Sequence, residues 1–151
     1  MYSIEEFDEA KTKVLKYVIY KKRTEQEIRI KFNGSIEENM LEDIIEYLKD
    51  AKYINDKEYI EKTINNFKIL KNLSKVEIRY KLLSKGIKKN DIEDYFYINK
   101  EELNEYEIKS AYNIIIKKQK DMDLEEISRY LLKKGYNSDN IQIAIDELKI
   151  F

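Results

Sequence analysis

The sequence has 151 residues but contains no cysteine and no histidine. Without cysteine, the chain cannot form disulfides, use a thiol as a nucleophile or hold a metal ion through thiolates. Without histidine, it lacks the side chain that most often serves as a general base or as a ligand for transition metals. We interpret its adjacent carboxylates, such as Glu37 and Glu38, as solvated faces of helices. We therefore predict that the chain is not an enzyme and has no catalytic residues, no metal site and no cofactor.

The sequence also lacks proline and has only three glycines. Because these residues interrupt helices most strongly, their scarcity favours long helices joined by short turns. The isoleucine run at 114–116 stops at Lys117, and no apolar run approaches the roughly 18 residues of a membrane span. The acidic start of the sequence does not have the pattern of a signal peptide. We expect a cytoplasmic protein with no part in the membrane.

An internal repeat is visible in the helix caps. Thr24, Ser74 and Asp123 lie 50 and 49 residues apart, and a glutamate follows each of them after three residues. This spacing is a capping box, in which the first side chain accepts a hydrogen bond from a backbone amide of the first helical turn. An isoleucine follows each box, and another apolar residue follows four positions later, so both face one side of a helix. We predict one such middle helix in each of three repeats.

Each repeat also contains signals for an opening helix and a closing helix. Two of the middle helices end at Gly86 and Gly135, where glycine suits the left-handed conformation of a helix end. The predicted caps of the opening helices are Ser3, Asn55 and Asn104, and those of the closing helices are Asn39, Asn90 and Asp139.

These signals predict an all-α protein with three tandem three-helix repeats at residues 1–54, 55–103 and 104–151. A single three-helix unit of this size buries little of its surface and is only marginally stable. We therefore expect the repeats to stack as a short curved solenoid with one continuous core, and we expect a monomer. The alternative is a compact bundle of nine helices with incidental spacing.

Four stretches of the sequence resemble the RecX family. Arg23–Ile28 resembles the family's entry into a helix, and Tyr53–Tyr59 resembles its signature joint between repeats. Ile78–Ile87 is similar to the family's pattern of isoleucine, leucine and a closing Lys-Gly-Ile, which Leu131–Tyr136 repeats in part. We expect structural roles for the signature residues, which are Tyr53, Asp56, Tyr59, Gly86 and Gly135.

The resemblance implies a function and a partner. Proteins of the RecX family lie along the groove of the filament that the recombinase RecA forms on single-stranded DNA. They limit growth of the filament or promote its loss, and so damp recombination and the damage-induced response. The resemblance therefore implies that this chain binds RecA or the RecA–single-stranded-DNA filament, through RecA alone or also through DNA phosphates, and inhibits the recombinase.

One segment is strongly basic, although the formal net charge of the chain is −1. Residues 68–89 include eight basic side chains and one acidic side chain. The first and third repeats each carry a basic residue in register with this segment. We predict a partner-binding stripe, and the alternative is a solvated surface whose charges suit helix ends. The predicted stripe comprises Lys71, Lys75, Arg79, Lys81, Lys85, Lys88, Lys89, Arg29 and Lys134.

Two other functions fit the pattern of helices. One is direct binding of nucleic acid by three-helix modules of the helix-turn-helix type, although the nearly neutral net charge speaks against it. The other is a general helical scaffold for protein partners, which the repeats alone would permit. The stretches at Tyr53–Tyr59 and Lys85–Ile87 favour the RecX interpretation over both.

Overall fold

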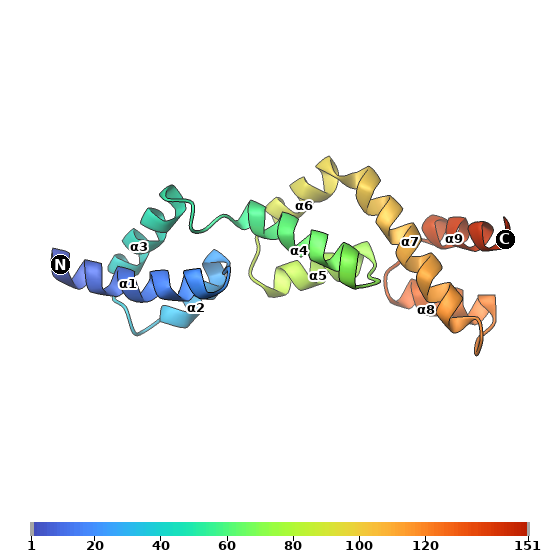
Figure 1. The fold of residues 1–151 in the computed structure, drawn as a ribbon, viewed down its shortest axis with the longest axis horizontal. Coiled ribbons are helices and arrows are strands. Elements are labelled where there is room, and N and C mark those ends of the chain that lie inside the picture. Colours follow the sequence, from blue (N-terminus) through green and yellow to red (C-terminus); the bar gives the residue numbers. More distant parts are fainter. Residues whose placement is uncertain (1, 151) are drawn as a thin grey trace.

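The computed structural model describes residues 2–150, which form nine α-helices. Figure 1 shows the helices arranged in a row, with α1 and α9 at opposite ends. The core clusters divide the row into three modules, α1–α3, α4–α6 and α7–α9. The all-α prediction and the three stacked three-helix repeats are thereby confirmed, and the compact bundle is excluded. In chain order the helices are α1 (Ile4–Tyr20), α2 (Glu25–Phe32), α3 (Glu38–Asp50), α4 (Asp56–Leu70), α5 (Lys75–Ser84), α6 (Lys89–Ile98), α7 (Lys100–Lys118), α8 (Leu124–Lys133) and α9 (Ser138–Ile150).

Five of the predicted caps begin helices as expected. Their side chains each accept a hydrogen bond of 2.8–3.1 Å from the backbone amide three residues later. Because α2, α5 and α8 are only 8 to 10 residues long, they are too short to be stable alone, and each cap contributes about 1 kcal/mol. The five caps are Ser3, Thr24, Asn55, Ser74 and Asp123.

The other four predicted caps are wrong, because these helices begin earlier in the sequence. The side chain of Glu37 caps α3, and Lys88 precedes α6 without a side-chain cap. The side chain of Asn137 accepts from the backbone amides of Asp139 and Asn140 in the first turn of α9. Helix α7 already begins at Lys100. In a chain rich in Asn, Asp and Glu the cap pattern occurs often, and packing of the apolar face decides where a helix begins. The incorrect positions were Asn39, Asn90, Asp139 and Asn104.

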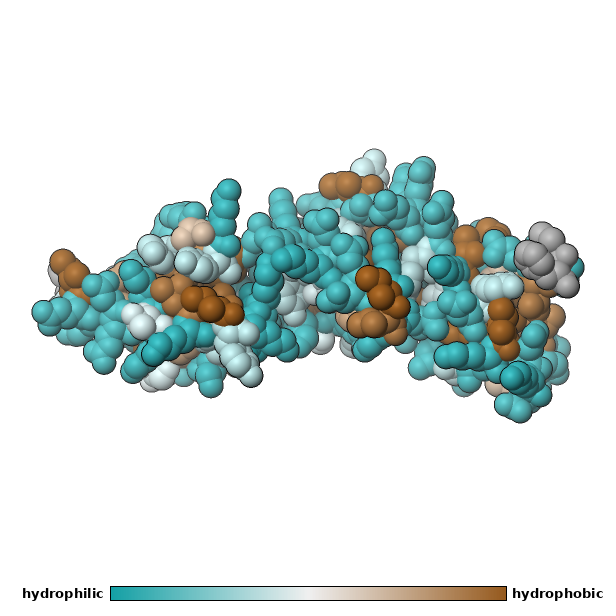
Figure 2. All heavy atoms as spheres, in the orientation of Figure 1, coloured by the Kyte–Doolittle hydropathy of each residue, from teal (hydrophilic) through white to brown (hydrophobic). Residues whose placement is uncertain are grey.

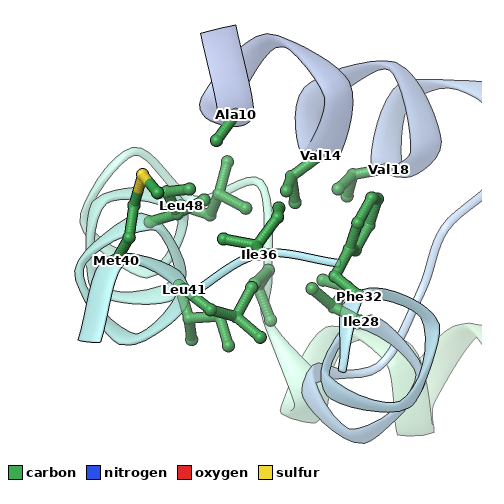
Figure 3. Close-up of a cluster of buried hydrophobic side chains, with 12 residues drawn as sticks. Ala10, Val14, Val18, Ile28, Phe32, Ile36, Met40, Leu41 and Leu48 are labelled. Carbon is green, nitrogen blue, oxygen red and sulfur yellow. The ribbon is translucent and has the colours of Figure 1, made fainter. Parts of the chain in front are cut away.

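The core is divided into three clusters, so the expectation of one continuous core is wrong. Figure 3 shows the first cluster, in which Val14 and Val18 of α1 face Ile28 and Phe32 of α2, with Ile36 in the middle. The second cluster lies within α4–α6 and the start of α7, and the third lies within α7–α9. Burial of each large side chain contributes roughly 1.5–3 kcal/mol, so most of the stability resides inside the modules.

Helix α7 takes part in two of these clusters. Leu103 and Tyr106, near its start, are buried in the second cluster, whereas Ala111 and Ile115 are buried in the third. The predicted boundary between residues 103 and 104 therefore falls inside α7, the helix that joins two repeats. We keep the division into residues 1–54, 55–103 and 104–151 as a proposal.

Residues 2–150 contain no helix that is both long and apolar enough to cross a membrane. In the same part of the chain, no three acidic side chains gather in a group that could hold a metal ion. The chemistry of the molecule therefore has to be sought on its surface and in the contacts between its repeats.

Candidate partner-binding surface

The three middle helices follow one another along the array. The Thr24 hydroxyl at the start of α2 donates a 2.8 Å hydrogen bond to the Lys85 carbonyl at the end of α5. The Ser74 hydroxyl at the start of α5 donates a 2.7 Å bond to the Lys134 carbonyl at the end of α8. The amino-terminal end of one helix, which carries partial positive charge, thus meets the carboxyl-terminal end of the next, which carries partial negative charge, and this arrangement of helix dipoles is stabilising. We call α2, α5 and α8 the middle-helix file, which Figure 1 shows running along the molecule.

Two glycines allow these helix ends to meet. Gly86 and Gly135 have φ angles of +84° and +94°, in the left-handed region that favours glycine. A Cβ atom on Gly86 would lie 2.3 Å from the Cβ of Gln26, and one on Gly135 would lie 2.7 Å from the Cβ of Val76. Both glycines are therefore required by the turn and by the close approach of the next middle helix.

The cap residues inside the file have a second role that the sequence did not reveal. The hydroxyls of Thr24 and Ser74 accept a bond from their own helix and also donate one to the neighbouring repeat, and both residues are fully buried. A carboxylate could accept but not donate. Asp123, the third cap, is exposed at the start of α8. The three caps look equivalent in sequence, but only two of them join repeats.

The two predicted arginines occupy equivalent places, and both are neutralised. Arg29 pairs with Glu25 at 3.1 Å and forms two hydrogen bonds with Glu42 of α3. Arg79 pairs with Glu93 of α6 at 2.9 Å. The hydrogen bonds from Arg29 lower the pKa of the Glu42 carboxyl below its usual value. These arginines therefore tie a middle helix to a closing helix, and they offer little free charge to a partner.

The lysines of the basic segment divide into two groups. Lys68 lies 3.5 Å from Glu102, and Lys75 lies 3.9 Å from Glu107 and donates to Asn104. Within residues 2–150, no carboxylate lies within ion-pair distance of the others, which are exposed. Lys71 is at the end of α4, separate from the rest. We call the remaining four, at the end of α5 and the start of α6, the free lysine group: Lys81, Lys85, Lys88 and Lys89.

Exposed apolar side chains accompany these charges. Figure 2 shows hydrophobic patches over each of the three modules, set in a hydrophilic surface. Each helix of the file exposes at least one large apolar residue, and contiguous exposed apolar surface marks interaction sites in soluble proteins. These exposed residues include Ile30 on α2, Tyr80 and Leu83 on α5 and Leu132 on α8. Lys134 is also exposed, directly after α8.

The signature joint between the first two repeats is partly buried. Ile54 belongs to the first cluster, while Tyr59 packs against the second and burial raises the pKa of its phenol. Tyr53 remains 47% exposed. Asp56 accepts a 3.3 Å hydrogen bond from the Glu25 amide, so it satisfies the start of a helix in the preceding repeat.

Two solved structures share this arrangement of helices. A crystal structure of RecX from Lactobacillus salivarius superposes with a TM-score of 0.84 over 99% of this chain and 100% of that chain, at 24% identity. A crystal structure of a regulatory protein RecX superposes with a TM-score of 0.80 over 93% of this chain and 72% of the other, at 22% identity. No protein-family model matches the chain.

Curated relatives extend this likeness to the sequence. The regulatory protein RecX of Clostridium perfringens is 33% identical over 142 residues, which cover 89% of this chain and 66% of the relative. That of Clostridioides difficile is 28% identical over 97% of this chain and 71% of the relative. The chain belongs to the RecX family. Its RecX relatives are named as regulatory proteins, in agreement with the expectation that the chain is not an enzyme.

The RecX relatives are longer than this chain. It spans 71% and 66% of the two clostridial proteins and 58% of RecX from Staphylococcus epidermidis. The file, its exposed apolar residues and the free lysine group therefore belong to the region that this chain shares with its longer curated relatives.

Proposed function

We propose that this RecX chain regulates the recombinase RecA by binding RecA or the RecA–single-stranded-DNA filament in the cytoplasm. The proposed effect is inhibition, exerted by a monomer through the middle-helix file. The observation that carries the proposal is the free lysine group beside exposed apolar residues, on an elongated array of the RecX fold. The arginines Arg29 and Arg79 on the file are paired with glutamates, whereas the four lysines of this group are not paired within residues 2–150.

The shape of the molecule supports a partner that is itself repetitive. Successive repeats in a row offer several small contacts at once, and linked contacts bind more tightly than any of them alone. Apolar residues supply contact area, and lysines steer association with an acidic surface or with phosphates. A protein filament on DNA presents both kinds of surface.

The proposal is tested by reversing the charge of Lys81, Lys85 and Lys88 to glutamate together. Arg79 is kept, because its loss would disturb the contact between α5 and α6. We expect roughly tenfold weaker binding to RecA filaments at low salt, measured by co-sedimentation, with a matching loss of inhibition in a RecA ATPase assay. Helicity by circular dichroism should not change.

A matched control reverses Lys13, Lys16 and Lys109, which are exposed on α1 and α7 and change the net charge equally. This control should bind like the parent. If the two triple variants bind filaments equally, the free lysine group is only a solvated surface and the proposed binding site is wrong.

Direct binding to nucleic acid is the second candidate, and the free lysine group is the observation that favours it. Contacts to phosphates make affinity fall steeply as salt rises. Binding to bare single-stranded DNA should therefore be compared with binding to the filament over a range of salt. Equal affinity for both would support this candidate, whereas preference for the filament supports regulation of RecA.

A further inference from the structure

Helix α5 is apolar on two opposite sides. Ile78 and Leu82 are fully buried in the second core cluster. Val76 and Tyr80 lie on the opposite side of the helix, with Leu83 beside them. We call these three residues the outer face of α5; Tyr80 is 75% exposed, and the other two are about half-exposed. Because a helix that is apolar all round is normally covered on every side, the outer face of α5 has the composition of a buried surface.

The equivalent positions of the other two middle helices are mostly polar. Helix α8 has an ion pair of 3.5 Å between Glu125 and Arg129 there, and α2 has one exposed apolar residue, Ile30. Since α5 lies between α2 and α8 along the row (Figure 1), the file is apolar at its centre and more polar toward both ends. Protein interfaces have this anatomy, with an apolar centre inside a polar rim. The equivalent residues are Gln26, Ile30 and Asn33 in the first repeat and Glu125, Arg129 and Leu132 in the third.

The charge beside the outer face of α5 is positive. Lys81 on α5 belongs to the free lysine group, and the other members of that group follow it in the chain. The nearby carboxylates are engaged elsewhere: Glu77 accepts a 3.0 Å bond in its own capping box, and Glu93 pairs with the arginine of α5 at 2.9 Å. Asp91 and Asp94 of α6 line a pocket that α4 also lines. A partner on this face therefore meets unneutralised lysines, and carboxylates are the groups that complement them.

The spacing of the outer face indicates the shape of the partner. Val76, Tyr80 and Leu83 follow one another at steps of four and three residues, so they form a straight ridge along one side of α5. Since α5 has 10 residues, it is about 15 Å long. Ridges of one helix pack into the grooves of another, and an amphipathic helix laid on an apolar face is a recurring mode of recognition. An amphipathic helix of about three turns would cover the whole face.

We propose that the outer face of α5 is the apolar centre of the binding site, and that it receives an amphipathic helix of RecA whose apolar side is bordered by carboxylates. Tyr80 is the anchor, because it is the largest and most exposed side chain of the face and lies at its middle. The apolar contact supplies affinity, while the free lysine group orients the helix and speeds association. This inference rests on the proposed binding to RecA and names the kind of RecA surface that is bound.

The anchor is tested by Tyr80→Ala, with Tyr97→Ala as a matched control. Tyr97 of α6 is 76% exposed, so the two changes remove the same side chain from equally open positions. Tyr80→Ala should weaken co-sedimentation with RecA filaments by about tenfold, whereas Tyr97→Ala should change it by less than about twofold. Equal affinities of the two variants would overturn the inference and leave the proposed function standing. If the parent does not bind filaments, the proposed function fails and the inference fails with it.

A conservative variant separates loss of the contact from loss of the fold. Because both tyrosines are exposed on helices and alanine favours a helix, both alanine variants should keep the helicity of the parent, measured by circular dichroism. Tyr80→Phe keeps the ring and should bind filaments within about twofold of the parent. A Tyr80→Phe variant as weak as Tyr80→Ala would show that the hydroxyl makes the contact, and would overturn an apolar anchor.

Salt separates the apolar contact from the charges. At about 0.5 M salt, surface charges are screened over about 4 Å. The loss of affinity caused by reversing Lys81, Lys85 and Lys88, measured against the parent in the same salt, should then shrink to less than about twofold. The loss caused by Tyr80→Ala should remain about tenfold, because apolar contacts are not screened. A Tyr80→Ala loss that disappears at high salt would overturn the role of this residue as an apolar anchor.

Hydrogen exchange in RecA filaments identifies the bound surface. The parent should protect a helical segment of RecA that has an apolar side bordered by carboxylates, and Tyr80→Ala should lose this protection while Tyr97→Ala keeps it. Protection confined to a basic or non-helical segment would overturn the proposed chemistry of the partner. So would an equal loss of binding to bare single-stranded DNA in Tyr80→Ala, because a base stacked on the tyrosine would then be the occupant.

Discussion

The two junctions of the array share one backbone contact and differ in the side chains around it. In both, a buried hydroxyl at the start of a middle helix donates to the last carbonyl of the next middle helix, beside a left-handed glycine. Around this contact the second junction, between repeats two and three, has Tyr106, Glu107 and Asn140. The first junction, between repeats one and two, has Asp56, the ion pair of Lys22 with Glu58 and a longer link between helices. The comparison teaches that one stacking geometry can be closed by different side chains.

The largest effects are expected where a side chain is forced into these contacts. Gly135→Ala should lower the free energy of unfolding by about 4 kcal/mol, because left-handed strain adds to a clash with the branched Val76 side chain. Gly86→Ala should cost a similar amount, because left-handed strain adds to a clash with the Cβ of Gln26. Urea unfolding followed by circular dichroism measures both values.

Gly34→Ala is the control for this pair. Gly34 also has a positive φ, of +85°, but a Cβ there would meet no atom within 4 Å. The expected loss is about 1 kcal/mol, from strain alone. A loss at Gly135 no greater than that at Gly34 would show that the second junction is not tightly packed.

An intermediate effect is expected from removing the carboxylate of each junction. Glu107→Ala leaves the Lys75 amide and the Asn140 side chain buried without an acceptor, and should cost about 2–3 kcal/mol. Asp56→Ala also removes an acceptor, but Asp56 is only partly buried and accepts a single bond of 3.3 Å from the Glu25 amide, so its loss should cost less than about 1 kcal/mol. Thermal unfolding compares the two variants, and equal losses would show that the buried network of Glu107 contributes no more than the single bond of Asp56.

The smallest effect is expected in the link of the first junction. Lys52 follows α3 with a φ of +64°, in the left-handed region that costs a non-glycine residue about 1–2 kcal/mol. Lys52→Gly should therefore raise the free energy of unfolding, by about 0.5 kcal/mol after the greater entropy of the unfolded glycine is counted. Lys57→Gly, inside α4, is the opposite control and should destabilise. A destabilising Lys52→Gly would mean that the backbone at this position is unstrained.

Much of the fold followed from short-range patterns. The capping boxes at Thr24, Ser74 and Asp123 located three helices, and the Lys-Gly endings located two helix ends, because such interactions join residues only a few positions apart. The same patterns misplaced the start of α7 at Asn104, which lies inside that helix. The signal there was matched by chance, and packing against the second cluster extended the helix toward its amino-terminal end.

The candidate surface followed from the sequence only in outline. The basic segment was visible, but Arg79 is neutralised by Glu93, 14 residues away, and the Lys75 ammonium lies 3.9 Å from Glu107, 32 residues away. No local pattern predicts such partners. Only the contacts of the folded chain separate Lys81, Lys85, Lys88 and Lys89 from the paired residues around them.

The sequence by itself determined that the chain is helical, that it repeats about every fifty residues and that it resembles the RecX family, since all three are written in local spacing. The tertiary structure alone decided that the core is split into three clusters and that two similar junctions differ. The physical reason is distance along the chain: groups such as Glu107 and Asn140 come together only when separate helices pack. Helix caps and apolar stripes depend on residues within a few helical turns, whereas electrostatic interactions act between any groups that the fold brings close together.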